Sequence, residues 1–241
     1  MIASGITSMA KELRLTELAH GRFSLEEHAA HEQFLLKLLT AEISAREKRA
    51  EAERIKRANL PAYKSFEEFD TDFQKGVGAE ELSTLARLQW IDDQYNLVLI
   101  GPPGTGKTHI ALAVANKAVR EGRRVFFADM DALMHILKTA EISMQSAARI
   151  KWIKKCDLVV IDEVGYLPVT NMEANLFFGL ISSLYEKASV IITSNKGFTG
   201  WADMLGDSVL TTALLDRLTH RCQLLDFEDE SWRLAHREQI F

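Results

Sequence analysis

From about residue 80 onward, short apolar runs alternate with longer stretches that carry apolar residues at helical spacing. The runs are rich in β-branched and aromatic residues, which favours strands. Strands that alternate with helices are typical of βαβ units, in which the strands are parallel and buried on both faces. We therefore predict an α/β fold with a five-stranded, mostly parallel sheet and helices on both faces. The five strands, all expected to be buried, are NLVLIG, RRVFFAD, DLVVID, SVIITSN and RCQLLDF.

The chain up to about Asn59 has a helical pattern and no strand-like run. A short helix, SMAKELRLTELAH, is predicted to stop at Gly21, and a long helix follows it. Ser24 and Glu27 have the spacing of a capping box at the start of the long helix. The apolar residues that then recur near the helical period are Leu25, Phe34, Leu35, Leu38 and Leu39.

Composition is that of a globular protein, with 47% hydrophobic and 26% charged residues in a chain of 241. No apolar run is long enough to span a bilayer and the start lacks the core of a secretion signal, so we expect a cytoplasmic protein with no membrane partner. Cys156 and Cys222 lack metal-ligand spacing and are expected to be reduced thiols in the core. The predicted organisation is a helical N-terminal domain over 1–60, a hinge over 61–79 and an α/β domain over 80–241.

The segment GPPGTGKT follows the first predicted strand and precedes an unbroken helical stretch. It fits the pattern G-x-x-x-x-G-K-[ST], in which glycines let backbone N–H groups surround phosphate oxygens. Lys107 begins the helix and is expected to reach the outer phosphates, while the Thr108 hydroxyl can coordinate Mg²⁺. The residues predicted to bind the nucleotide are Gly101, Pro102, Pro103, Gly104, Thr105, Gly106, Lys107, Thr108 and His109.

Polar residues stand at the ends of two further strands, and ligands of open α/β sheets bind at such ends. Asp162 is expected to hold Mg²⁺ through its waters, and Glu163 to orient and polarise an attacking water. Asn195 can hold that water against the γ-phosphate, with a turn-forming role as the alternative. The carboxylate pair indicates hydrolysis.

Arg217 ends a helix just before the last predicted strand. It is either a solvated arginine at a helix end or an arginine finger that enters the site of an adjacent subunit. The last strand is expected to lie away from Asp162 and Glu163, which favours a neighbour's γ-phosphate over its own.

The net charge of −5 gives no support for nucleic-acid binding by the molecule as a whole, so any such surface has to be local. Two segments are candidates: REKRAEAERIKR at 46–57 and RIKWIKK at 149–155, although the basic residues of the second do not gather on one face of a helical wheel. The alternative for the first is a solvated helix face with ion pairs four residues apart. The candidate DNA-binding residues are Arg46, Arg49, Lys56, Arg57, Arg149, Lys151, Lys154 and Lys155.

The order of these parts resembles the AAA+ ATPases. More closely, LVVIDEVGYLP, TSNKGFTGW and ALLDRLTHRC resemble the IstB family, the ATP-binding helper proteins of bacterial insertion sequences, over about Leu15 to Arg237. The resemblance implies a helical N-terminal domain on an AAA+ core without a separate lid. It also implies catalytic roles for Glu163, Asn195 and Arg217, with ATP and Mg²⁺ as cofactors.

The same resemblance implies a homo-oligomer with the arginine finger in trans. It implies assembly on double-stranded DNA with little sequence preference, and a transposase of the same element as partner. A helicase loader of the DnaC type and a monomeric P-loop kinase remain alternatives. A second-sensor role for Arg233 is left open, because the tail reads DESWR where the family commonly has Gly-Glu-Ser-Tyr-Arg.

Overall fold

The computed structural model describes residues 2–15, 19, 29–74, 76–166, 169–228 and 230–236. The chain divides into two compact units, Met1–Glu53 and Arg54–Phe241. The boundary falls within helix α3 (Ala29–Ala58). The last turn of α3 and the segment predicted as a hinge therefore belong to the larger unit.

The smaller unit contains α1 (Ile2–Glu12) and most of α3. The predicted first helix has the wrong bounds, since α1 begins at Ile2 and ends well before Gly21. A small core joins Ile6 and Leu13 to Leu39. Phe34 and Leu38, expected in the same apolar stripe, are 68% and 53% exposed. The capping box at Ser24 and Glu27, and Leu25 after it, lie outside the described residues.

The larger unit is built on one sheet with the strand order β2-β3-β4-β1-β5. Every neighbouring pair is parallel, which confirms the predicted five-stranded sheet and makes it wholly parallel. The strands are β1 (Asn96–Ile100), β2 (Val125–Asp129), β3 (Leu158–Val164), β4 (Ser189–Ser194) and β5 (Cys222–Asp226).

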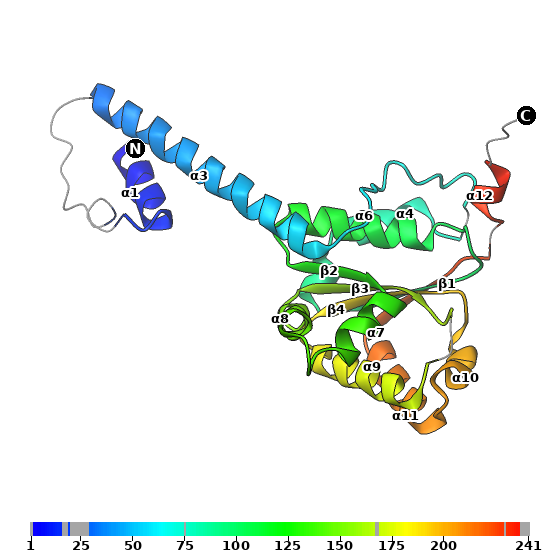
Figure 1. The fold of residues 1–241 in the computed structure, drawn as a ribbon. Coiled ribbons are helices and arrows are strands. Elements are labelled where there is room, and N and C mark those ends of the chain that lie inside the picture. Colours follow the sequence, from blue (N-terminus) through cyan, green and yellow to red (C-terminus); the bar gives the residue numbers. More distant parts are fainter. Residues whose placement is uncertain are drawn as a thin grey trace, which may run out of the picture. The chain divides into compact units, whose positions relative to one another are not determined.

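Helices cover both faces of the sheet (Figure 1). Alternate side chains of each strand point to opposite faces, so Leu97 and Leu99 enter one core while Val98 and Ile100 enter the other. The first core is shared with α4 (Ala79–Ala86), α5 (Gln89–Asp92) and α6 (Lys107–Arg120). The second is shared with α7 (Met130–Lys138), α8 (Met144–Ile153), α9 (Asn171–Leu184), α10 (Trp201–Leu205) and α11 (Ser208–Thr219), next to a short 3-10 turn, η1 (Phe198–Gly200).

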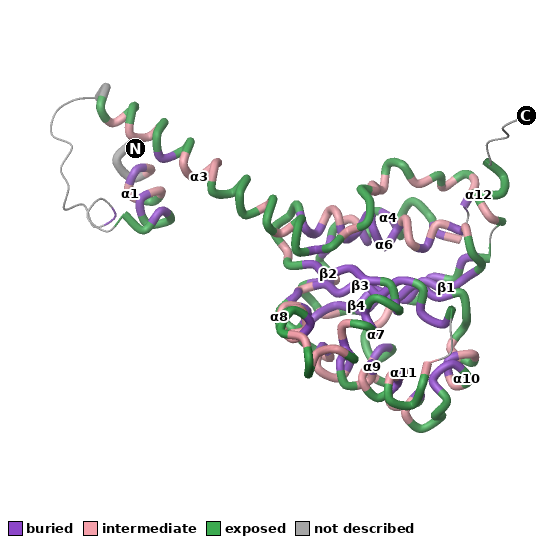
Figure 2. Tube along the Cα trace, viewed as in Figure 1, coloured by how far each residue is buried: buried purple, intermediate pink, exposed green. Residues whose placement is uncertain are grey.

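Strands β1 to β4 are mostly buried, as Figure 2 shows. The prediction of a buried strand is wrong for β5, in which only Leu225 is buried. β5 pairs with β1 alone and forms an edge. The other edge strand, β2, is buried because α6 and α7 pack against it, whereas the main helix contact of β5 is with α11. Among the described residues, α12 (Trp232–Ala235) is the single element that follows β5.

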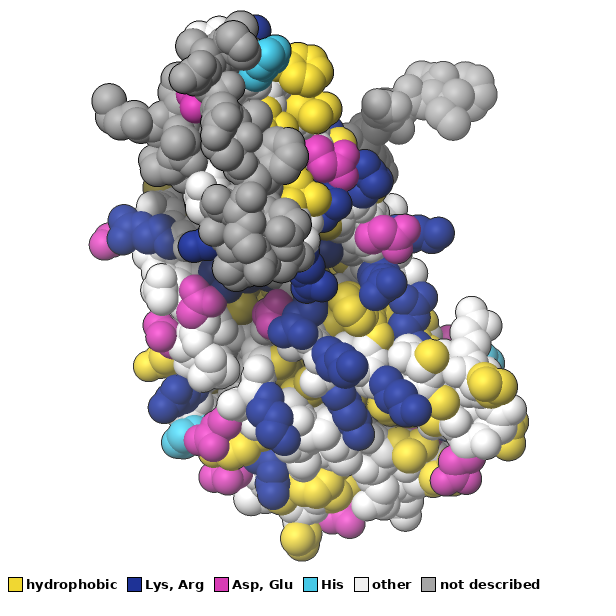
Figure 3. Space-filling model, turned by 90° about the vertical axis from the view of Figure 1, so that its left-hand side faces the viewer, with side chains coloured by type: hydrophobic (Ala, Val, Ile, Leu, Met, Phe, Trp, Pro, Cys, Tyr) yellow, Lys and Arg dark blue, Asp and Glu magenta, His cyan; other side chains and the backbone are white. Residues whose placement is uncertain are grey.

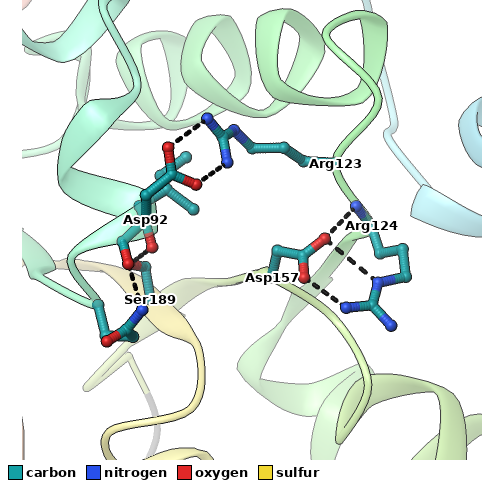
Figure 4. Close-up of polar contacts among 7 residues, drawn as sticks. Asp92, Arg123, Arg124, Asp157 and Ser189 are labelled. Atoms are coloured by element: carbon teal, nitrogen blue, oxygen red, sulfur yellow. Dashed lines mark hydrogen bonds and ion pairs between the residues drawn. The ribbon is translucent and has the colours of Figure 1, made fainter.

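Ion pairs hold together the starts of the strands (Figure 4). Arg123 forms a bidentate pair with Asp92, and Arg124 pairs with Asp157. Burial acts to raise the pKa of the Asp157 carboxyl. The hydrogen bonds and the charge of Arg124 outweigh this effect, so the pKa is lowered. The amino ends of β2 and β3 are thus fixed by charge, whereas ligands of open α/β sheets bind at the carboxyl ends of the strands.

Candidate functional site

The phosphate-binding loop predicted at 101–108 joins the end of β1 to the start of α6. Gly101 and Gly106 have φ values of 144° and 96°, which side-chain-bearing residues rarely adopt. Space is also short: a Cβ atom on Gly101 would lie 2.2 Å from the carbonyl oxygen of Phe227, and one on Gly106 would lie 2.6 Å from the Phe69 ring. The glycines of the motif are therefore required by conformation and by packing.

The ammonium group of Lys107 is folded back onto this loop. Its Nζ donates hydrogen bonds to the carbonyl oxygens of Gly101, at 2.7 Å, and Pro102, at 2.6 Å. Burial lowers the pKa of Lys107, an effect that Asp162 opposes and Arg233 reinforces. The loop therefore carries a positive charge in a partly desolvated setting, where an anion would interact with it strongly.

Asp162 and Thr108 meet beside the loop, although they come from β3 and α6. The Thr108 hydroxyl donates to the Asp162 carboxylate, with Oγ1 lying 3.0 Å from Oδ1 and 3.2 Å from Oδ2. Asp162 is only 6% exposed. The two side chains that the sequence assigns to Mg²⁺ are thus in direct contact.

Glu163 follows Asp162 in a strained backbone conformation, with a φ of 60°. The pairing of β3 with β4 shifts register between Ile161 and Val164, so Glu163 leaves the regular ladder. Its N–H group donates instead to Thr193 Oγ1, at 2.9 Å. The Thr193 hydroxyl in turn donates to the Asp162 carboxylate. One buried threonine therefore connects both acidic residues.

These side chains line a pocket of about 590 Å³ at the carboxyl ends of the strands. Asn195 lies in the same pocket, as its position after β4 predicts. The predicted site residues that line it are Pro103, Gly104, Gly106, Lys107, Thr108, His109, Asp162, Glu163 and Asn195. Gly101, Pro102 and Thr105 do not line it but shape the loop from behind, through the Lys107 bonds and a 2.9 Å bond from the Thr105 hydroxyl to the Pro102 carbonyl.

A further wall of the pocket was missed by the sequence reasoning. It comes from the segment predicted as a hinge, which runs along α6: His109 Nε2 lies 2.8 Å from the Ser65 carbonyl oxygen, and Phe69 packs edge-on against His109. Phe69 and Gln74 line the pocket from this segment. The signal in the sequence is the close spacing of large aromatic residues, Tyr63, Phe66, Phe69 and Phe73, among charged ones.

The C-terminal tail completes that wall. The Trp232 N–H group donates to the Gly104 carbonyl oxygen at 3.0 Å, which ties α12 to the phosphate-binding loop. Trp232 and Arg233 both line the pocket. Arg233, which the sequence left open, therefore lies in the same pocket as Lys107.

Arg217 does not line this pocket. It lines a small recess that also includes Asn96 and Val190, at the amino ends of β1 and β4 and thus at the opposite edge of the sheet. Its guanidinium donates to the Ala213 carbonyl oxygen at 2.7 Å and lies over the Phe178 ring, 4.8 Å from the centroid. Arg217 is held in place, and it is held away from the phosphate-binding loop of its own chain.

The candidate DNA-binding residues fall into two groups. In the smaller unit, Arg46 pairs with Glu42 at 2.8 Å and Arg49 lies 3.9 Å from the same carboxylate, which fits the alternative of an ion-paired helix face. In the larger unit, Arg57 lies over the Trp152 ring, 5.2 Å from its centroid. Arg149 lies over the Phe126 ring at 5.4 Å.

The second group forms what we call the basic surface, made of Lys56, Arg57, Arg149, Lys151, Lys154 and Lys155 from the last turn of α3 and from α8 with the turn after it. The four lysines and Arg57 are exposed. Figure 3 looks at this side of the molecule and shows Lys and Arg side chains gathered over it, with few acidic ones between them. The two ring contacts hold the arginines while the lysine ammonium groups reach solvent.

Within the described residues, no helix is both long enough and apolar enough to cross a membrane. Nor do these residues contain a cluster of three His, Cys, Asp or Glu side chains suited to a metal ion. Cys156 and Cys222 are free, and burial raises the pKa of the Cys156 thiol to about 12.

Comparison with known proteins gives one consistent result. A family model described as IstB-like ATP binding protein matches residues 8–240. The chain is 39% identical over 236 residues to an ATP-binding protein of insertion sequence IS21 from Pseudomonas aeruginosa, covering 96% of this chain and 89% of that protein. It is 34% identical over 219 residues to the corresponding protein of IS5376 from Geobacillus stearothermophilus, covering 91% and 87%.

Solved structures share the fold of the larger unit. DnaA of Aquifex aeolicus bound to AMPPCP matches with a TM-score of 0.56 and 24% identity, over 73% of this chain and 53% of that one. The DnaC helicase loader matches with a TM-score of 0.51 and 20% identity, over 71% and 97%. At these identities the likeness concerns the AAA+ fold alone.

Proposed function

The chain belongs to the family of IstB-like ATP binding proteins, and on this premise we propose that it is a transposition helper that hydrolyses ATP while assembled on duplex DNA. The observation that carries the proposal is the convergence of Lys107, Thr108, Asp162 and Glu163 on one pocket. Family membership favours this role over a metabolite kinase. It also favours it over a helicase loader, because the likeness to DnaC rests on fold.

ATP would place its phosphates at the loop, where glycine N–H groups, the start of α6 and Lys107 all attract negative charge. The residues beside the loop suit Mg²⁺. They offer hard oxygen ligands, one hydroxyl from Thr108 and one carboxylate from Asp162, and Mg²⁺ is usually held by few protein groups together with phosphates and waters. When bound, the ion would neutralise charge on the phosphates.

Glu163 is proposed to orient and polarise the attacking water. Asn195, which follows β4, is proposed to hold that water from the neighbouring strand end. The structure supports this with two observations. Glu163 is exposed and lines the pocket, whereas Asp162 is buried. The hydrogen bond from the Glu163 N–H to Thr193 holds the backbone of Glu163 in place, and this position determines where its side chain enters the pocket.

The proposed arginine finger is Arg217, acting on a neighbouring subunit. Its place at the amino ends of the strands separates it from the phosphate-binding loop of its own chain, which supports action in trans. A homo-oligomer with head-to-tail contacts would bring each Arg217 to the next pocket. The transposase of the same element is proposed as the partner that such an assembly would recruit.

Duplex DNA is proposed to bind at the basic surface. Lysines at the end of a helix can contact backbone phosphates, which gives affinity with little sequence preference. Arg57 and Arg149 would mainly shape this surface, because their guanidinium groups lie over aromatic rings.

The test is nucleotide binding and ATP turnover by two variants, with duplex DNA present. Glu163→Gln should keep ATP affinity but lose turnover by at least about 10²-fold, because it keeps the shape of the side chain and loses the charge. Lys107→Ala should lose affinity. Glu186→Gln is the matched control, since Glu186 also has a left-handed φ, of 55°, and lies away from this pocket. Turnover at the wild-type rate in Glu163→Gln would overturn the assignment.

A further inference from the structure

Gln74 is a buried amide whose carbonyl oxygen lacks a partner. The residue is 2% exposed and lines the pocket. It belongs to the wall formed by the segment before α4 and by the C-terminal tail, not to the strand ends that carry Asp162 and Asn195. Its Nε2 donates to the Glu230 carbonyl oxygen at 3.0 Å. Its Oε1 is buried and has no hydrogen-bond partner within the described part of the chain.

The orientation of this amide is fixed by its one bond. A backbone carbonyl can only accept, so the NH₂ group of Gln74 has to face Glu230 and Oε1 has to face away from it. A buried acceptor without a donor costs free energy, so such a group in a native protein calls for a partner, which is an ordered water or a ligand. The missing partner is therefore a hydrogen-bond donor.

The part of the pocket wall that carries Gln74 is ordered by hydrogen bonds. Asp70 Oδ1 accepts hydrogen bonds from the backbone N–H groups of Asp72 and Phe73, each at 3.1 Å, and the Gln74 N–H donates to the Asp70 carbonyl at 3.0 Å. On the tail side, Trp232 is tied to the phosphate-binding loop through Gly104. The amide of Gln74 bridges these two segments.

The same wall suits a flat ring. Phe69 and Trp232 line the same pocket as Gln74, and both offer apolar ring surface. The phosphate-binding loop takes the charged end of a nucleotide, which leaves the base for this part of the pocket. An adenine base offers an amino donor at position 6, whereas guanine carries an acceptor oxygen at the same place.

We propose that Gln74 is the residue that reads the base, by accepting a hydrogen bond from the 6-amino group of adenine at Oε1. This inference rests on the proposed nucleotide-binding function and adds the identity of the base. Guanine would place its acceptor oxygen against Oε1, which is also an acceptor, and no hydrogen bond could form. The pocket would therefore bind adenine nucleotides more tightly than guanine nucleotides.

The experiment measures the affinity of the full chain for three nucleotides: ATP, purine riboside triphosphate, which lacks the 6-amino group, and GTP. The wild-type protein should bind ATP about tenfold or more tighter than purine riboside triphosphate, and GTP no better than the latter. This comparison requires no variant, so it stands whether or not a substituted protein folds.

The variant Gln74→Met keeps the length of the side chain and removes the acceptor. ATP affinity should fall to that of purine riboside triphosphate, while the affinity for purine riboside triphosphate changes less than about threefold. Gln94→Met is the matched control, because Gln94 also donates to a backbone carbonyl, that of Asp92, and lies outside this pocket. It should leave both affinities unchanged.

Two results would overturn the role of Gln74. The first is equal affinity of the wild-type protein for ATP and purine riboside triphosphate, which would mean that Oε1 is satisfied by a water molecule. The second is an equal loss for both nucleotides in Gln74→Met, which would assign the residue to the wall alone. If none of the three nucleotides bound the wild-type protein, the proposed function itself would fail.

Discussion

The hydroxyl group of Thr108 donates to the carboxylate of Asp162 although 54 positions separate them in the chain. The strand that precedes the loop, β1, and the strand that carries Asp162, β3, are not neighbours either, because β4 lies between them. The contact therefore joins the phosphate-binding loop to the acidic strand end across the middle of the sheet. Thr193, which stands on β4 between them, adds its own bond to the same carboxylate.

Replacing the Thr193 hydroxyl should impair turnover more than nucleotide affinity. Thr193→Val keeps the shape of the side chain but removes the acceptor for the Glu163 N–H and a donor to Asp162. We expect kcat for ATP to fall about 10- to 100-fold, since a misplaced catalytic group is costly, and KM to change less. Thr193→Ser restores the hydroxyl and should restore most of the rate.

Thr211→Val is the control for that series. Thr211 is also a buried threonine, at 3% exposure, and its hydroxyl donates to the carbonyl of Asp207, the residue that caps the start of α11. A similar loss of kcat in Thr211→Val and Thr193→Val would indicate general destabilisation rather than positioning.

Two inactive variants should complement each other if the active site is shared. Arg217→Ala alone should lose about 10³ to 10⁵ in ATP turnover and keep nucleotide binding, and Glu163→Gln alone should also be nearly inactive. In an equal mixture that co-assembles on DNA head to tail, about one site in four pairs an intact Glu163 with an intact Arg217. ATP turnover across mixing ratios measures the recovery.

Arg221→Ala serves as the control in this series, because Arg221 lines the same recess and its guanidinium donates to the Asp93 carbonyl. It should keep turnover near the wild-type rate. Absence of recovery at every ratio, in mixtures shown to co-assemble, would count against a finger in trans.

The basic surface should set the salt dependence of DNA binding. Replacing Lys151, Lys154 and Lys155 by alanine removes three phosphate contacts, so the slope of log affinity against log salt should flatten by about 2 to 3. Binding to unrelated duplexes should weaken equally. The control replaces Arg87, Lys117 and Lys187, which lie outside the basic surface. An unchanged slope in the first variant would remove α8 from the interface.

Much of the fold could be predicted because the hydrophobic pattern of most segments matches their place in the structure. Buried parallel strands read as apolar runs, and the phosphate-binding loop has a spacing that chance rarely produces. The exposed strand β5 could not be distinguished, because its sequence, CQLLD, resembles a buried strand and its exposure depends on how few helices pack against it. The part of the pocket formed by Phe69, Gln74 and Trp232 was missed for a related reason, since contacts between distant segments leave no period in the sequence.

Stability should depend on pH through Glu173, which joins α7 to α9. Its carboxylate accepts hydrogen bonds from Lys138 Nζ at 2.6 Å and from the Thr170 N–H at 2.8 Å. These contacts, led by the Lys138 bond, lower the pKa of Glu173 from 4.5 to about 2. A lowered pKa means that the stabilisation is complete above about pH 4.5 and is lost as the pH falls toward 2.

Glu173→Gln should therefore lower the free energy of unfolding by about 1 to 2 kcal/mol at pH 7. The difference from the wild-type protein should shrink between pH 4.5 and pH 2, as measured by urea unfolding at each pH. Glu141→Gln, on the exposed turn after α7, should cause little change at either pH. A difference that stayed constant with pH would mean that the charge of Glu173 is not what stabilises the junction.

The left-handed backbone at Glu163 predicts that one substitution at this position raises stability and lowers ATP turnover. A non-glycine residue in this conformation costs about 1 kcal/mol or more relative to glycine, and the structure accepts this cost where it places a carboxylate in the pocket. Glu163→Gly should consequently melt at a higher temperature than the wild-type protein while losing turnover. Under the proposed role of Glu163, the substitution that relieves the backbone at this position is thus the one that removes the carboxylate from the pocket, so a gain in melting temperature and a loss of turnover should appear together.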